Sequence, residues 1–232
     1  MAKRKYNRES EGMICIPQSP FTEFGIPKLP PVRKRALAVK TVQAIAALPY
    51  MPDVSWGENR YNLAKDMFLL SFALVGMNSV DLYNCDCIED GRITYRRTKV
   101  TGRRADGAEI SIRIEPEILP LVEKYRDPAG ERVFKFHRMY ATPNTFNCAI
   151  NRGLKKIGAE NGVNVEDLEF YAARHSWATI AVNVAGINKY AVHEALNHVS
   201  GEMKVTDIYI KKDYSLIDEA NRKVLDCVNL KL

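Results

Sequence analysis

The chain has 232 residues, of which 46% are hydrophobic and 27% charged, as is typical of a soluble globular protein with one substantial domain. Its formal net charge of +6 permits a nucleic-acid partner but does not establish one. The odd number of cysteines argues against a disulfide framework, and their spacing argues against a zinc site. No apolar run approaches the ~18 residues of a membrane span, and no signal peptide is recognisable, so we expect a cytoplasmic protein.

Residues 1–32 differ in composition from the rest of the chain. Five prolines fall between Ile16 and Arg35, and because proline fixes φ and removes a hydrogen-bond donor, this stretch is predicted to be an extended linker. The polar residues before it carry too little apolar surface to fold alone. We therefore expect residues 1–32 to be the end of a preceding domain with its linker, and residues 33–232 to form the main domain.

Two helices are predicted next from the spacing of their apolar residues. The first covers residues 36–48. The second covers residues 58–77 and carries a stripe at i, i+4, i+7 and i+11 that is typical of a helix buried on one face: Leu63, Met67, Leu70 and Leu74. Gly76 is expected to end the second helix.

The period of the pattern then changes to two. Residues 92–100 and 108–114 alternate apolar and polar side chains on either side of an Asp106-Gly107 turn signal, which predicts a β-hairpin. The outward face of the first strand and the loop carry five cations and no acid, more positive charge than solubility requires: Arg96, Arg97, Lys99, Arg103 and Arg104.

The remaining segments predict further helices. Residues 117–127 indicate a short helix, 132–136 a possible third strand, and 142–160 a helix with Thr142 at its N-cap and Pro143 in its first turn. From Tyr171 onward the chain is predicted to be mostly helical, and its last helix has an apolar face made by Leu216, Ala220, Val224 and Leu225. The fold class is therefore α+β, mainly α, with one small antiparallel sheet.

The stretch EFYAARHSWATIAVNVAG opens with aromatic residues and an Arg-His pair and then becomes apolar. Four residues are expected to bury this helix: Trp177, Ile180, Ala181 and Val184. Arg174 lies at its mouth, where a guanidinium is costly to desolvate unless it meets an anion. That anion is either a carboxylate of the protein or a phosphate of a ligand, which the planar guanidinium binds through two oxygens.

Four separated features follow one another in a specific order: the basic hairpin, the ARHSWAT helix, the ALNH sequence ending at His198, and the TDIYI sequence around Tyr209. In this order they resemble the catalytic domain of the tyrosine recombinases, the integrases of phages and mobile elements. The resemblance covers residues 33–232, and the sequences RTKV, ANRKVL and SPFTEFGIPKLPPVRKRAL are similar to a bacterial mobile-element subgroup. It implies that residues 1–32 end a core-binding domain and lead into this catalytic domain.

The resemblance implies a site-specific DNA recombinase that integrates or excises a mobile element. Tyr209 would attack a DNA phosphodiester and form a 3′-phosphotyrosyl intermediate, which conserves the energy of the bond without ATP. Arg174 would bind the non-bridging oxygens, His198 would contact the same phosphate or assist proton transfer, and Lys99 would protonate the leaving 5′-oxygen. The family uses no metal or other cofactor.

One departure from the family concerns its first catalytic arginine, which stands in a G-x-R-x-x-[DE] context. Here the sequence is GMNSVD, with Asn78 at that position. Asparagine donates a hydrogen bond but carries no charge, and losing a charge-assisted contact could cost several kcal/mol in the transition state. Either another arginine takes the role, for which Arg97, Arg96 and Arg103 are candidates, or the enzyme is weakened.

Other departures concern the neighbouring motifs. The H-x-x-R box reads YAAR, so Tyr171 holds the histidine position and would donate a hydrogen bond to phosphate. The adjacent His175 is expected at the DNA, either contacting it or bonding a backbone group beside the site. The spacing from His198 to the tyrosine is longer than the commonest family pattern, and the VSGEMK loop absorbs the difference. Tyr214 is the competing nucleophile, although it is expected to begin the last helix.

Two other functions remain open from sequence. One is a DNA-binding protein of the same fold that has lost catalysis, and the other is an unrelated helical enzyme. We expect double-stranded DNA as partner, bound weakly and largely non-specifically by this chain, with a homotetramer on DNA and a monomer when free. The last helix would dock either on a neighbouring protomer, as the resemblance implies, or on its own chain.

Overall fold

The computed structural model describes residues 2–16, 35–53, 59–99, 101–103, 107–198 and 213–230. The chain divides into two compact units, Met1–Arg33 and Lys34–Leu232. In the first unit, α1 (Ala2–Tyr6) is followed by the 3-10 turn η1 (Glu9–Glu11). The side chain of Asn7, between these two elements, exchanges hydrogen bonds with the backbone of Ile16. Most of the proline-rich stretch, residues 17–34, lies outside the described residues.

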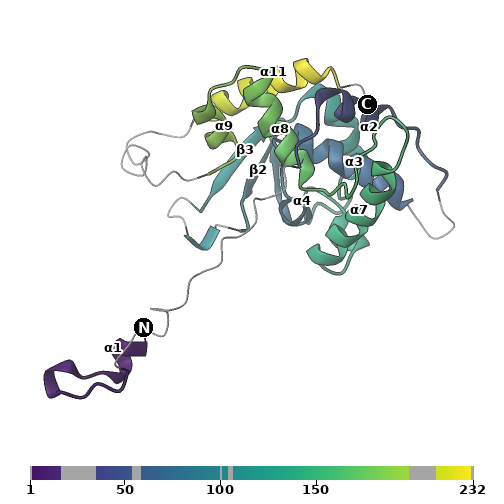
Figure 1. The fold of residues 1–232 in the computed structure, drawn as a ribbon. Coiled ribbons are helices and arrows are strands. Elements are labelled where there is room, and N and C mark those ends of the chain that lie inside the picture. The colour runs from purple at the N-terminus through teal and green to yellow at the C-terminus, as the bar shows by residue number, and fades with distance from the viewer. Residues whose placement is uncertain are drawn as a thin grey trace. The chain divides into compact units, whose positions relative to one another are not determined.

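The second unit confirms the predicted class, since it is mainly helical and carries one small antiparallel sheet (Figure 1). No helix within the described ranges is long and apolar enough to cross a lipid bilayer. Its elements are α2 (Val39–Ala47), α3 (Arg60–Ala73), α4 (Ser79–Asn84), β1 (Cys87–Glu89), β2 (Arg92–Arg96), η2 (Thr101–Arg103), β3 (Glu109–Arg113), η3 (Pro116–Ile118), α5 (Leu119–Lys124), α6 (Phe136–Met139), α7 (Pro143–Gly158), α8 (Ala172–Asn183), α9 (Lys189–Ala195) and α11 (Ser215–Val228).

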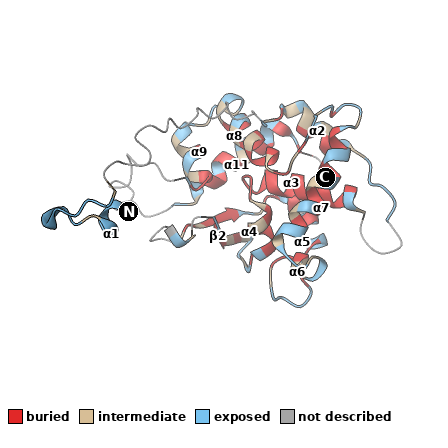
Figure 2. Cartoon of the chain, turned by 60° about the horizontal axis from the view of Figure 1, so that its bottom comes forward, coloured by how far each residue is buried: buried red, intermediate tan, exposed pale blue. Residues whose placement is uncertain are grey.

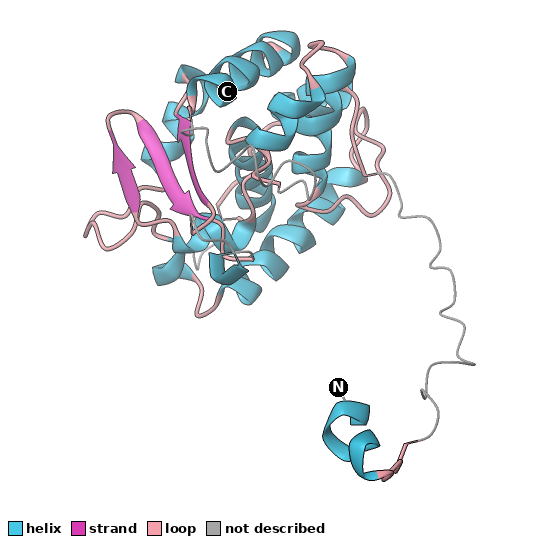
Figure 3. Ribbon diagram, turned by 90° about the vertical axis from the view of Figure 1, so that its left-hand side faces the viewer, coloured by secondary structure: helices cyan, strands magenta, loops and turns pink. Residues whose placement is uncertain are grey.

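The three strands pair antiparallel in the order β1-β2-β3, and the sheet lies along one side of the helices (Figure 3). The predicted hairpin is confirmed as β2 and β3, with Thr94 opposite Ser111 and Arg96 opposite Glu109. Residues at alternate positions of β2 are buried, so one face of the hairpin packs on the helices and the other faces outward.

The prediction of a strand at residues 132–136 is wrong. Phe134 forms only an isolated bridge with Arg126, and the third strand of the sheet is β1. A two-residue turn of Asp90 and Gly91, both at positive φ, joins β1 to β2. Asp-Gly is a strong hairpin signal, so this strand was readable from the sequence.

Helix α3 is the centre of the unit and is buried all around rather than along one stripe (Figure 2). It contacts α2, α5, α7, α8 and the 3-10 turn η3. Gly153 of α7 permits the closest of these approaches, because a Cβ there would lie 2.4 Å from the Cβ of Ala64. The helix ends at Ala73, and the chain leaves it through Val75 and Gly76, both at positive φ.

The charged side chains inside this core have partners. Asp66 of α3 is fully buried and accepts hydrogen bonds from Tyr50 Oη at 2.6 Å, Tyr125 Oη at 2.8 Å and Lys124 Nζ at 2.6 Å. These bonds tie α3 to the segment after α2 and to the end of α5. A buried carboxylate with three donors follows the general rule that charges are buried only when paired.

Helix α7 begins as predicted, with Thr142 as its N-cap and Pro143 in its first turn. The Thr142 hydroxyl accepts a hydrogen bond from the Thr145 N–H at 3.1 Å, and the Thr145 hydroxyl accepts one from the Thr142 N–H at 3.1 Å. This reciprocal capping box satisfies two amide groups that the start of a helix otherwise leaves without partners.

Helix α11 has the predicted bounds and docks on its own chain, against α2, α8, α9 and β3. Asn221 fixes its position, since its amide accepts from Trp177 Nε1 at 2.9 Å and donates to the Ala73 carbonyl at 2.8 Å. Two residues predicted to be buried are exposed, Leu216 on α11 and Val184 at the end of α8. Ile217 is buried in place of Leu216, while Ala220, Val224 and Leu225 are buried as predicted.

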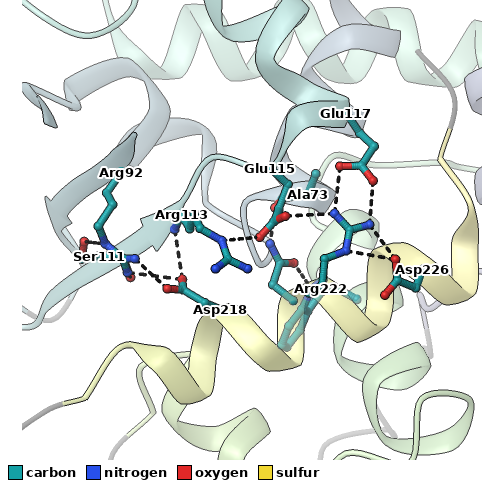
Figure 4. Close-up of polar contacts among 11 residues, drawn as sticks. Ala73, Arg92, Ser111, Arg113, Glu115, Glu117, Asp218, Arg222 and Asp226 are labelled. Atoms are coloured by element: carbon teal, nitrogen blue, oxygen red, sulfur yellow. Dashed lines mark hydrogen bonds and ion pairs between the residues drawn. The ribbon is translucent and has the colours of Figure 1, made fainter. Parts of the chain in front are cut away.

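Charged side chains attach α11 to the sheet and to η3, and we name them the α11 network (Figure 4). Asp218 accepts from Arg92 Nη1 at 2.6 Å and from the Arg113 N–H at 3.1 Å. Arg222 donates to Glu115 at 2.9 Å and to Glu117 at 2.6 Å, and its hydrogen bonds to carboxylates raise its pKa further above the ordinary value. The members are Arg92, Arg113, Glu115, Glu117, Asp218, Arg222 and Asp226.

Candidate anion-binding site

Arg174 lies in the first turn of α8 and is buried, with 6% of its surface exposed. Its backbone packs against Gly76, where a Cβ would lie 2.5 Å from the Cα and the Cβ of Arg174. Gly76 has φ +70°, so both its conformation and its surroundings require glycine. The guanidinium donates to the Gly76 carbonyl at 3.2 Å and to the Leu196 carbonyl, which fixes its orientation between α3 and α9.

Arg97 lies directly after β2 and is also buried, with 7% exposed, so its assignment to the outward face is wrong. Side chains alternate along a strand, and Arg97 continues the buried series of Ile93 and Tyr95, whereas Arg96 is exposed. Its Nη1 donates to the Leu196 carbonyl at 3.3 Å and lies 3.5 Å from the Asn197 carbonyl. Arg97 and Arg174 therefore share one acceptor.

His198 completes this group two residues after Leu196. Its Nε2 lies 3.5 Å from Nη2 of Arg174, and its ring meets the ring of His193 edge-on at 5.5 Å. His198 is exposed, yet desolvation by its neighbours, followed by the positive charges of Arg174 and Arg97, lowers its pKa to about 4. At neutral pH His198 is therefore uncharged and presents one donor and one acceptor nitrogen.

The charges at this site do not balance. Within the described residues, neither Arg97 nor Arg174 has a carboxylate within ion-pair distance; their hydrogen-bond partners are backbone carbonyls and, for Arg174, the His198 ring. Desolvation, followed by repulsion from Arg97, lowers the pKa of Arg174. A guanidinium nevertheless stays protonated in proteins, so two adjacent buried cations favour an anion with several oxygens.

Asp81 of α4 is the buried acid that acts on both arginines electrostatically. Burial raises its pKa, while a hydrogen bond from the Thr98 N–H at 2.9 Å and the charges of Arg97 and Arg174 oppose that change. The carboxylate thereby holds the backbone between Arg97 and Lys99 against α4. Asp81 is absent from the sequence-based site, although it fills the acidic position of the GMNSVD motif.

Lys99 is exposed and lies two residues after Arg97. Arg96 is exposed on the outward face, where its Nε lies 3.8 Å from Glu109. Arg103 ends η2, and the structure does not describe its side chain, while Arg104 lies outside the described residues. Of the three arginines considered as replacements for the missing one, Arg97 alone is seen beside Arg174.

Tyr171 and His175 lie next to Arg174 on the same turn. Their rings meet edge-on at 4.9 Å, and Tyr171 is the N-cap residue of α8. Desolvation, followed by the charges of Arg35 and Arg174, lowers the pKa of His175. His175 thus contacts the Tyr171 ring, and its expected place at the DNA stays a prediction. Asn78 is the N-cap of α4, two residues after the carbonyl that accepts from Arg174.

Tyr209, the predicted nucleophile, lies outside the described residues, as does the whole VSGEMK loop. Tyr214, the competing tyrosine, is the N-cap residue of α11, as predicted, and its ring lies 5.9 Å from the Arg92 guanidinium. Tyr214 thus contributes to the start of the last helix.

No protein-family model, curated protein or solved structure matches the chain. The likeness to tyrosine recombinases therefore stays a prediction that depends on the residues themselves. In the part of the chain that the structure describes, no three His, Cys, Asp or Glu side chains gather as ligands for a metal ion.

Proposed function

We propose that the chain is a tyrosine-type DNA strand transferase, a site-specific recombinase that cleaves and rejoins DNA through a 3′-phosphotyrosyl intermediate to integrate or excise a mobile element. The observation that carries the proposal is the pair of buried guanidiniums of Arg97 and Arg174 beside His198. These side chains come from the hairpin, the ARHSWAT helix and the ALNH sequence, three of the four features on which the resemblance depends.

In this proposal Arg174 and Arg97 bind the non-bridging oxygens of a DNA phosphodiester and stabilise the charge of its transition state. Arg97 replaces the arginine that is absent at Asn78, because it shares the Leu196 carbonyl with Arg174. Tyr209 attacks phosphorus, and the leaving 5′-oxygen takes a proton from Lys99. Neutral His198 donates a hydrogen bond to the same phosphate, and Tyr171 does so in place of a histidine.

The second candidate function is a DNA-binding protein of the same fold without catalysis, and the observation that favours it is Asn78 at an arginine position. The burial of Arg97 beside Arg174 weakens this alternative, because the charge is supplied from the hairpin. In both cases the partner is double-stranded DNA, with a tetramer on DNA, a monomer when free, and a bacterial cytoplasmic setting.

The decisive experiment uses a nicked duplex carrying the crossover site of the element that encodes the chain. Cleavage next to the nick releases a short strand and traps a covalent protein–DNA adduct, which denaturing electrophoresis detects. We expect the adduct with the wild type and with Tyr214→Phe, and none with Tyr209→Phe. No adduct with the wild type would favour the binding protein, and an adduct with Tyr209→Phe would reject the assigned nucleophile.

Arg97 is tested on the same substrate. Removing one charge-stabilising donor typically costs about 10²–10³-fold in rate, so we expect Arg97→Gln to slow adduct formation by about that factor. Arg96→Gln is the matched control, since this neighbouring arginine is exposed on the opposite face. Equal rates for Arg97→Gln and the control would show that Arg97 does not replace the missing arginine.

A further inference from the structure

Asn197 makes a contact that the proposed chemistry does not use. It is buried, with 6% exposed, and lies between Leu196 and His198 with φ +51°. Its Nδ2 donates a hydrogen bond to the Ala108 carbonyl at 2.8 Å. Asparagine is one of the few residues with a side chain that accepts this backbone conformation, so the position combines a tight turn with a polar contact.

The acceptor of this bond, the Ala108 carbonyl, lies directly before β3, where the hairpin loop ends. The Ala108 carbonyl also accepts from the Arg97 N–H at 3.1 Å, which closes the segment that contains Lys99. Ala108 is fully buried, so water does not replace the contact without opening the hairpin. Asn197 therefore joins two parts of the site that lie 89 residues apart in the sequence.

We propose that Asn197 is a positioning residue that holds the hairpin end, with Arg97 and Lys99, at a fixed distance from the turn that carries His198. This inference rests on the proposed function. The hydrogen bond from Asn197 and the Leu196 carbonyl act at the same turn, since that carbonyl accepts from both arginines. Loss of the Asn197 amide loosens the hairpin end and displaces the lysine from the oxygen that it protonates.

The contact is tested first without any activity assay, by hydrogen exchange of the Arg97 amide. Asn197→Gly keeps the left-handed backbone and removes the donor, whereas Asn164→Gly makes the same change at an exposed asparagine with φ +47°. One net hydrogen bond corresponds to about a fivefold change in local opening, so we expect exchange about fivefold faster in Asn197→Gly alone. Unchanged exchange would overturn the contact.

The positioning role is tested by the cleavage rate at saturating nicked duplex. We expect Asn197→Gly to be about tenfold slower than wild type, with DNA affinity within about twofold, because the changed contact is with the hairpin rather than with DNA. Asn197→Asp, which has the same shape without the donor, should be slowed similarly. Asn164→Gly should match wild type.

A second substrate separates positioning from general damage. This substrate is a nicked duplex with sulfur in place of the leaving 5′-oxygen. The sulfur departs without a proton, because a thiol has a pKa of only about 8.5. If Asn197 positions Lys99, the sulfur substrate restores the rate of Asn197→Gly to near that of wild type. An equal defect on both substrates, or no defect on either, would overturn the role. If wild type forms no adduct, the proposed function and the role fall together, while the exchange result still decides the contact.

Discussion

The arginines of the α11 network and those of the anion-binding site differ in the partners they meet. Arg92 and Arg222 are half-buried and each lies 2.6 Å from a carboxylate oxygen, and two of the acids in this network, Asp218 and Glu115, are buried. Arg97 and Arg174 are buried as deeply as those acids, yet their partners in the described residues are backbone carbonyls. The first group holds α11 in place, whereas the second carries a charge that folding does not neutralise.

The difference separates stabilising charge from functional charge. Breaking a buried ion pair leaves an uncompensated charge, which costs about 3–5 kcal/mol. Burying an arginine without a carboxylate partner costs desolvation free energy that no ion pair offsets, and replacing that arginine removes this cost. The comparison therefore predicts that the same substitution, arginine to methionine, lowers the free energy of unfolding much more in the first region than in the second.

The largest effect is expected for Arg222→Met. The change leaves Glu115 and Glu117 without their shared cation, so the free energy of unfolding should fall by about 3 kcal/mol. Urea unfolding followed by circular dichroism measures it. Glu115 keeps Arg113 at 2.8 Å, so the carboxylate left unpaired is Glu117, and adding Glu117→Gln should restore part of the loss. A drop below about 1 kcal/mol for Arg222→Met would mean that the network contributes little.

A smaller effect is expected for Arg174→Met. The guanidinium has no carboxylate partner among the described residues, and the Leu196 carbonyl keeps its bond from Arg97, so the free energy of unfolding should stay within about 1 kcal/mol of wild type. Inorganic phosphate should raise the thermal midpoint of wild type and leave that of the variant unchanged. A loss as large as that of Arg222→Met would remove the distinction between the two regions.

The smallest effect concerns His198 and pH. Its folded pKa of about 4 lies below the unfolded value of 6.5, so the unfolded chain binds the proton first as pH falls. The stability that neutral His198 contributes is complete above about pH 6.5 and is lost between there and pH 4. His198→Gln should remove this loss in the free energy of unfolding between pH 6.5 and pH 4. The loss is less than about 1 kcal/mol, because solvent screens the ring.

The same histidine reports on the anion. Bound phosphate places negative charge beside the ring, so the pKa of His198 should rise by roughly one unit or more. Proton resonances of the ring measure this shift, and Arg174→Met is the control in which it should vanish. An unchanged pKa at saturating phosphate would place the anion elsewhere.

Local rules predicted much of this fold. Apolar spacing gave α7 and α11 their bounds, and the Thr142-Pro143 pair marked a helix start that the capping box explains. Arg174 was recognisable because a cation on an apolar helix requires a partner. Side-chain alternation also determines that Arg96 and Arg97 face opposite sides, but which of them is buried depends on how β2 packs against the helices.

Tertiary contacts determine what the sequence did not reveal. The buried side of α3 was predicted as a stripe, yet every residue from Tyr61 to Ala73 is buried, because several elements contact this helix. Leu216 and Val184 fit an apolar pattern and are nevertheless exposed, whereas Ile217 beside Leu216 is buried. The carbonyls that orient the arginines belong to Gly76 and Leu196. Because every residue carries a main-chain oxygen, the residue types at these positions do not indicate this role.

The shared Leu196 carbonyl has a consequence for mutational scanning. Every amino acid supplies the same backbone carbonyl oxygen, so replacing the leucine side chain leaves the acceptor of both guanidiniums in place. A scan that truncates side chains one at a time will record position 196 as a core leucine. Only a change to the backbone itself, such as an ester at the Leu196–Asn197 linkage, weakens that oxygen and exposes its part in the site.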